Sequence, residues 1–225
     1  MSIPPKTTFG RVSLPNTNLH YMKVCSGPPL VIVPATISVI RQWESLAQFM
    51  GQRYTTYFFE LPGHGDSSPY PEKFESYLVP QTVANFMDAM GHETFNLMGF
   101  SFGGLLAMRT LEVLQDRIDN VILLAPCVST RALLYSSRRQ WWIRHFFITL
   151  KSPKMQKYLL QILDSCLFDQ LLYSLFSRVG NFDKQILQTR DALRISQSTL
   201  DVLAYTVQEI LSVDYCYSDK PFSQR

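Results

Sequence analysis

The stretch NLMGFSFGGL, at residues 96–105, predicts the centre of the fold. The apolar run at residues 95–98 is typical of a strand that is covered on both faces. Apolar residues then recur near helical spacing and predict a helix; they are Leu105, Leu106, Met108, Leu111 and Leu114. Between the strand and the helix, residues 99–103 read Gly-x-Ser-x-Gly, the pattern of a nucleophile elbow.

A sharp turn at Ser101 explains the glycines around it. Gly99 and Gly103 lack a Cβ, so the chain can fold tightly there, and Gly104 is expected to let the helix approach the strand. Ser101 would then lie at the carboxyl end of a parallel sheet, with the Phe102 amide at a helix N-terminus facing a developing oxyanion. The alternative is a plain strand–helix turn, but the buried strand and the helix on either side favour the elbow.

Length and composition predict one globular domain with a substantial core. The chain has 225 residues, of which 46% are hydrophobic and 17% are charged. A net charge of +3 without a basic block excludes nucleic acid as the expected partner. Four distant cysteines indicate reduced, mostly buried thiols in a cytoplasmic protein; they are Cys25, Cys127, Cys166 and Cys216. Histidine and cysteine spacing predicts no metal, and we expect no cofactor.

Strand and helix patterns alternate along the chain. Residues 9–14 and 19–25 predict a hairpin, and strands are expected at residues 30–33, 55–60 and 121–125, the last of them buried. Ser38 is expected to cap a helix that Gly51 ends, and Gly91 is expected to close a second helix. This alternation predicts a mostly parallel, doubly wound sheet.

A rigid turn follows the strand at residues 55–60, because LPGHGDS at residues 61–67 holds two glycines and a proline. A histidine within such a turn more often orients or hydrogen-bonds than takes a proton, so His64 is predicted to have that role rather than to be the catalytic base. Asp66 is predicted to be a turn and helix-capping residue rather than a catalytic acid.

Three motifs together resemble the α/β-hydrolase superfamily, in its single-domain form with a lid: VIVPAT at residues 31–36, LPGHGDS at 61–67 and GFSFGG at 99–104. The resemblance covers residues 19–128. It implies that Ser101 is the nucleophile and that the amides of Phe102 and Thr36 form the oxyanion hole. Pro34 and Ala35 replace the family's His-Gly pair before Thr36. Glu60 stands where aspartate is commoner, a difference that we expect to matter little.

The same resemblance implies a division into a hydrolase core at residues 1–130, an inserted helical lid at 131–217 and the start of a further core strand at 218–225. Apolar helical stretches support the lid; they lie at residues 159–163, 167–176 and 200–211, with Pro153 and Gly180 between stretches. Its apolar content indicates a small hydrophobic acyl or ring-bearing substrate. The alternative is that an apolar side chain of the lid only fills the lid's own core, and for any single side chain we favour this alternative.

Basic and aromatic residues mix in RRQWWIRHFF at residues 138–147. This mixture suits peripheral contact with a membrane surface or the mouth of an apolar pocket. The alternative is a lid helix whose aromatic side chains dock on the sheet domain. We favour docking because the helix is short and its charges do not lie cleanly on one face, and we expect no stable membrane insertion.

A serine nucleophile needs a base and an acid, which in this superfamily follow the serine in the order acid, histidine. After Ser101 the sole histidine is His145, within the predicted lid, while Asp214 and Asp219 lie near its end. We therefore expect the acid and the base beyond Arg225, with the last two strand–helix units missing. We expect this chain alone to have little triad-dependent activity and to aggregate or dimerise. A displaced base at His145 remains the alternative.

These observations predict a serine hydrolase that cleaves an ester, thioester or related carbonyl substrate through an acyl-enzyme. Two alternatives stay open because a fold does not fix its chemistry. One is a non-catalytic protein that binds a small ligand beneath its lid. The other is a cofactor-free lyase or acyltransferase on the same fold.

Overall fold

A computed structural model describes residues 6–24, 27–132, 135–163 and 195–215. Several sequence predictions lie outside these ranges. They concern Cys25, Cys166, Cys216, Gly180, Asp219, the helical stretch at residues 167–176 and the further strand at 218–225.

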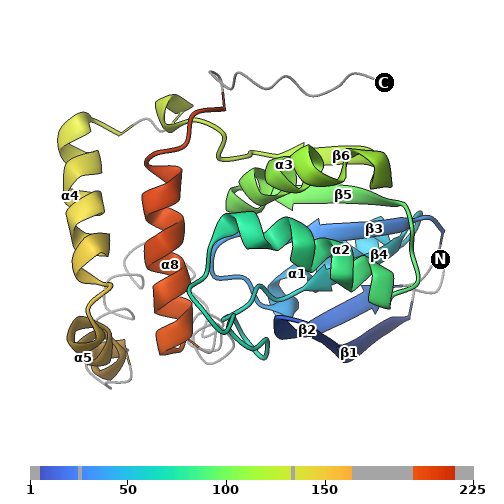
Figure 1. The fold of residues 1–225 in the computed structure, drawn as a ribbon, viewed down its shortest axis with the longest axis horizontal. Coiled ribbons are helices and arrows are strands. Elements are labelled where there is room, and N and C mark those ends of the chain that lie inside the picture. The colour runs from blue at the N-terminus through green and yellow to red at the C-terminus, as the bar shows by residue number, and fades with distance from the viewer. Residues whose placement is uncertain (1–5, 25–26, 133–134, 164–194, 216–225) are drawn as a thin grey trace, which may run out of the picture.

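Six strands form one sheet in the order β1-β2-β4-β3-β5-β6 (Figure 1). They are β1 Thr7–Leu14, β2 Thr17–Val24, β3 Pro29–Val33, β4 Thr55–Phe59, β5 Phe95–Phe100 and β6 Ile118–Leu124. β1 and β2 form the predicted hairpin, and β2 pairs antiparallel with β4. The pairs β3–β4, β3–β5 and β5–β6 are parallel, which confirms the doubly wound prediction.

Both faces of the sheet are covered, which explains the continuous apolar run of β3. Val31 and Val33 point into one core, which also holds side chains of the helices α2 Val79–Ala89 and α3 Phe102–Leu114. Leu30 and Ile32 point into the other, with the helix α1 Ile40–Met50. The short 3-10 helices are η1 Ser76–Leu78, η2 Gln115–Arg117 and η3 Thr130–Ala132. From β3 the chain continues to β4 on one side and later to β5 on the other, so the strand order reverses beside β3.

The start of α1 differs from the prediction. Val39, not Ser38, is the N-cap residue, and its N–H donates to the Gln42 side chain at 3.3 Å. Ser38 lies one residue too early to cap and is buried. The predicted end of this helix is confirmed, because the Gly51 N–H donates to the Ala47 carbonyl at 2.7 Å. Gly91 follows α2 with a φ of 79°.

β6 is the strand predicted over residues 121–125, and its first residue and its burial in the described chain differ from that prediction. The strand begins three residues earlier, at Ile118, and its residues are half-buried or exposed. Within the described chain β6 is the edge of the sheet, so it has a neighbour on one side, whereas β5 lies between two strands and is buried up to Gly99.

Three described helices follow β6 and lie beside the sheet domain: α4 Ser137–Thr149, α5 Pro153–Leu163 and α8 Gln197–Ile210 (Figure 1). Residues 128–130 and 213–215 join them to the sheet domain as a neck. In this neck the Thr130 N–H donates to the Val213 carbonyl at 2.9 Å, and the Tyr215 N–H donates to the Val128 carbonyl at 2.8 Å. The chain therefore leaves the sheet domain before α4 and returns to it after α8 at the same place.

α8 rests on the sheet domain, and α4 rests on α8. Val202 of α8 belongs to the larger core. The expectation that the aromatic side chains of α4 dock on the sheet is wrong, because α8 lies between α4 and the sheet and Trp142 is 65% exposed (Figure 1). Among the helices that the structure describes, none has the length and apolar character needed to cross a bilayer.

Candidate active site

Ser101 lies between the last residue of β5 and the first residue of α3, at a φ of 54° and a ψ of −117°. A positive φ costs a residue with a side chain about 1–2 kcal/mol, so the surrounding structure must hold it. It does so on both sides of the residue. The Ser101 N–H donates to the Leu124 carbonyl, and the Ser101 carbonyl accepts from the N–H groups of Gly104 and Cys127, each at 3.0 Å. The predicted strand–serine–helix geometry is confirmed.

The glycines around Ser101 are needed because backbone atoms lie where a Cβ would be. At Gly99 a Cβ would overlap the Gly103 carbonyl oxygen, and at Gly103 it would overlap the Val33 carbonyl oxygen. Gly104 differs from its prediction. A Cβ there would lie 2.6 Å from the Pro126 Cβ, so Gly104 makes room for the loop after β6, whereas Gly99 lets α3 approach β5 and Gly103 lets α3 approach the end of β3.

The loop after β3 meets the start of α3 at this edge of the sheet. Besides Val33, the Pro34 carbonyl lies 2.6 Å from the site of a Gly103 Cβ. Thr36 follows in a half-buried turn, beside Ile37 at a φ of 50°. Phe102 begins α3, where the backbone N–H has no partner within the helix. Both amides predicted for the oxyanion hole therefore belong to elements that converge beside Ser101.

Cys127 is the residue that the sequence analysis missed at this site. Its Sγ lies 3.6 Å from the Ser101 Oγ, and it is the hydroxyl's recorded partner among the described residues. The thiol is free and half-buried. The parallel pairing of β5 and β6 could have indicated this contact, because the carboxyl ends of neighbouring parallel strands meet at one edge.

Glu60 is buried, 4% exposed, and holds two loops at the same edge of the sheet. One carboxylate oxygen accepts from the Ile40 N–H at 3.1 Å. The other accepts from the Asp66 N–H at 2.7 Å and lies 3.1 Å from the His20 Nδ1. This carboxylate joins the start of α1 to the 61–67 turn, and the effect of glutamate in place of aspartate here stays a prediction.

The 61–67 turn is built around that carboxylate. Gly65 has a φ of 51°, and a Cβ there would overlap the Glu60 carboxylate. The Asp66 side chain lies 3.8 Å from the Arg11 guanidinium. Asp66 is a turn residue as predicted, but it caps no helix, because no helix begins next to it.

His64 is 2% exposed, and neither ring nitrogen has a partner at hydrogen-bonding geometry within the described chain. The His64 N–H donates to the Leu61 carbonyl at 2.9 Å. Burial lowers the pKa of His64 to about 4, against a smaller raising effect of the Pro62 backbone that faces the ring, so the ring is neutral at pH 7.

His145 and Asp214 have partners away from Ser101. His145 lies on α4, where its Nδ1 is 2.8 Å from the Trp141 carbonyl and its ring stacks on Trp141 with centroids 3.8 Å apart. Asp214 lies in the neck, with its carboxylate 3.6 Å from the Arg131 Nε. These contacts give no support to a base at His145.

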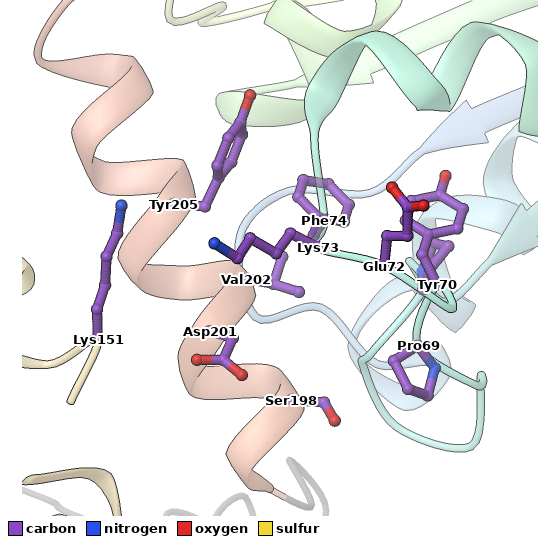
Figure 2. Close-up of a pocket in the computed structure, with 11 residues that line it drawn as sticks. Pro69, Tyr70, Glu72, Lys73, Phe74, Lys151, Ser198, Asp201, Val202 and Tyr205 are labelled. Atoms are coloured by element: carbon purple, nitrogen blue, oxygen red, sulfur yellow. The ribbon is translucent and has the colours of Figure 1, made fainter. Parts of the chain in front are cut away.

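A cavity of about 300 Å³ lies between α8 and residues 69–74 (Figure 2). Val202 and Tyr205 of α8 form one wall, and Tyr70 and Phe74 contribute from the facing loop. Its charged lining residues are Glu72, Lys73, Lys151 and Asp201. Ser101 is not among the residues that line it, so this cavity lies apart from the serine.

The sequence matches the alpha/beta hydrolase fold family over residues 28–206. With this match added to the doubly wound sheet and the turn at Ser101, the chain belongs to the alpha/beta hydrolase fold family.

The curated relatives of this chain include hydrolases of different kinds. The chain is 27% identical over 139 residues to N-formylmaleamate deformylase of Pseudomonas putida, covering 60% of this chain and 51% of that protein. It is 24% identical over 117 residues to pimeloyl-(acyl-carrier protein) methyl ester esterase of Nitrosomonas europaea, covering 51% of this chain and 44% of that protein. The chain therefore spans about half the length of these relatives.

A solved hydrolase from Pseudomonas aeruginosa has the same fold. It superposes with a TM-score of 0.65 at 15% identity, over 92% of this chain and 73% of that one. At that identity the likeness concerns the fold alone.

Proposed function

We propose that Ser101 is the nucleophile of a serine hydrolase that cleaves an ester, thioester or related carbonyl substrate through an acyl-enzyme. The observation that carries the proposal is the φ of 54° at Ser101, held between the end of β5 and the start of α3. Strained residues of this kind cluster at functional sites, and a serine on such a turn presents its hydroxyl at the edge of the sheet where ligands of this fold class bind.

The proposed reaction has two halves. The Ser101 Oγ attacks the carbonyl carbon, and its proton passes to a base and then to the leaving alcohol or thiol as the bond to that group breaks. Water then attacks the acyl-enzyme and releases the acid and the serine. The amides of Phe102 and Thr36 would hold the oxyanion, and one such donor contributes about 100-fold to 1000-fold to kcat.

We assign the catalytic acid and base to parts of the whole protein outside the described residues. This assignment is supported by the contacts of Ser101, His145 and Asp214, which join none of these three side chains to another. The helices α4, α5 and α8 act as the lid in this proposal, supported by the neck that joins the start of α4 and the end of α8 to the core. A small hydrophobic acyl or ring-bearing substrate belongs to this proposal through the apolar content of the lid sequence, because the cavity beneath α8 lies apart from Ser101.

Labelling with a fluorophosphonate tests the nucleophile in the complete gene product. The Ser101 Oγ–phosphorus bond forms, fluoride leaves and the base takes the proton. We expect one label, mapped by peptide mass to Ser101 and absent from Ser101→Ala. Ser152→Ala is the matched control, because Ser152 is exposed in the turn between α4 and α5 and should leave labelling intact.

Two results would overturn the proposal. Equal labelling of Ser101→Ala and the unaltered protein would place the nucleophile elsewhere. Retention of a small ligand without any label at Ser101 would favour the non-catalytic binding protein. Analysis of the products separates hydrolysis from transfer, since acyl groups delivered to an alcohol rather than to water would indicate an acyltransferase.

A further inference from the structure

The helices α4 and α5 carry an unbalanced positive charge. Residues 137–163 contain six basic residues and no aspartate or glutamate; the basic residues are Arg138, Arg139, Arg144, Lys151, Lys154 and Lys157. The whole chain has 21 basic and 18 acidic residues, so 15 basic and 18 acidic residues remain elsewhere. The net positive charge of the protein is therefore concentrated on these two helices.

Four of these cations form no ion pair within the described structure, although the Arg139 guanidinium lies over the Tyr135 ring, 4.6 Å from its centroid. Arg144 and Lys151 hydrogen-bond α8 and its end, to the Leu211 carbonyl and the Gln208 side chain. The other four are exposed, and none forms an ion pair with a carboxylate in the described part of the chain; they are Arg138, Arg139, Lys154 and Lys157.

Large apolar side chains are exposed beside those cations. Trp142 is 65% exposed, Tyr158 61%, Phe146 52% and Trp141 50%, and Ile148 and Met155 are exposed as well. The more buried residues of α4 and its C-cap are Ile143, Phe147 and Leu150. They are spaced four and three residues apart, so they lie on one side of the helix, and the exposed side is opposite. This basic aromatic face, residues 137–163, lies on the outer side of α8 from the sheet (Figure 1).

We propose that the basic aromatic face docks on an anionic lipid bilayer. Lysine and arginine are attracted by the negative potential of such a surface, while tryptophan and phenylalanine side chains lie at the boundary between headgroups and acyl chains. A nucleic acid would satisfy the cations but not aliphatic side chains such as Ile148 and Met155. A second copy of this face would bring two sets of positive charge together.

Vesicle co-sedimentation of the full chain tests this docking. We expect at least about tenfold stronger binding to vesicles of equal parts phosphatidylcholine and phosphatidylglycerol than to phosphatidylcholine alone. The first variant replaces the four cations without an ion pair by glutamine: Arg138→Gln, Arg139→Gln, Lys154→Gln and Lys157→Gln. It should lower binding to the mixed vesicles at least about tenfold. The second variant, Trp142→Ala with Phe146→Ala, should lower this binding by a similar factor.

Matched controls lie on α1, on the sheet domain. Arg41→Gln removes an exposed cation and Phe49→Ala an aromatic side chain that is 67% exposed, and neither should change vesicle binding. Circular dichroism of each variant checks that it is folded. Because binding is the readout, Ser101→Ala should bind vesicles as the unaltered protein does, so this inference and the proposed function fail independently.

Tryptophan fluorescence gives a second readout. The chain has three tryptophans, and Trp43 of α1 stacks on Phe58 of β4, with ring centroids 5.5 Å apart. Brominated lipids in the mixed vesicles should quench emission from Trp141 and Trp142. Quenching should be lost in Trp141→Phe with Trp142→Phe, where Trp43 remains.

Three results would overturn the proposal. The first is equal binding to both vesicle types. The second is vesicle binding that survives both sets of substitutions. The third is a protein that does not bind vesicles but binds single-stranded RNA or associates with itself, and that loses this binding or association on these substitutions.

Discussion

Glu60 shows how much one buried carboxylate can organise. Its two oxygens accept from backbone N–H groups that lie 20 residues upstream and 6 residues downstream, at Ile40 and Asp66. Hydrogen bonds to a charged acceptor stabilise more than neutral ones, and a buried carboxylate needs them to offset its lost hydration. The position of the carboxylate, and not only its charge, therefore holds the loops around the serine.

Glu60→Asp tests this point, because aspartate is one methylene shorter and cannot keep both backbone contacts without moving a loop. We expect the free energy of unfolding to fall by about 2 kcal/mol, the value of one lost hydrogen bond to a charged group. Urea unfolding measures it, with Glu93→Asp as an exposed control that should change little. Equal stability of Glu60→Asp and the unaltered protein would mean that the loops adapt freely to the shorter side chain.

At the scale of elements, the contact between β5 and α3 determines where Ser101 lies. Gly99 ends the buried part of the strand and Gly103 lies in the first turn of the helix, so their backbones touch without side chains between them. Such contact admits no extra atom unless one element moves, because protein interiors are closely packed.

Gly99→Ala should therefore destabilise the protein by about 3 kcal/mol or more, since the new methyl group meets the Gly103 carbonyl and the Ala107 Cβ. Gly10→Ala is the matched control in another strand. There the methyl group meets the end of the Tyr21 side chain, which can turn aside, so we expect a loss within about 1 kcal/mol. Thermal unfolding compares the two, and similar losses would contradict a rigid contact between β5 and α3.

On the scale of the whole molecule, a buried polar cluster attaches α8 to the core. Arg109 of α3 and Glu209 of α8 form an ion pair, and the Ser76 hydroxyl donates to the same glutamate at 2.5 Å. Tyr205 adds its hydroxyl, 3.3 Å from the Ser76 Oγ. These contacts join residues more than 90 positions apart and set how the helices after β6 sit on the sheet domain.

Glu209→Ala should leave the Arg109 guanidinium without its carboxylate. Breaking a buried pair costs about 3–5 kcal/mol, and the 26% exposure of the Arg109 side chain lowers our expectation to about 2–3 kcal/mol. Arg109→Met with Glu209→Met should recover part of that loss, because no charge is then buried. Urea unfolding measures all three proteins, and faster proteolysis near α8 should accompany Glu209→Ala. A double variant no more stable than Glu209→Ala would argue against the ion pair as the attachment.

The sequence by itself determined the alternation of strands and helices, the hairpin and the turn at Ser101. Each rests on local chemistry: an apolar run that suits a covered strand, and glycines where a Cβ has no room. It also indicated the family through three motifs in a fixed order. The burial of β6 does not follow from its residues, which are as apolar as those of a central strand, and within the described chain this strand has a neighbour on one side.

Only the tertiary structure decided the rest. In the folded chain Cys127 lies beside the Ser101 hydroxyl, and Glu60 accepts hydrogen bonds from two separate loops. The aromatic side chains of α4 are exposed, because α8 lies between α4 and the sheet. Each of these facts joins residues that are distant in sequence. Folding selects such pairs through packing and through the need to satisfy buried polar groups, and neither requirement can be read from the spacing of residues along the chain.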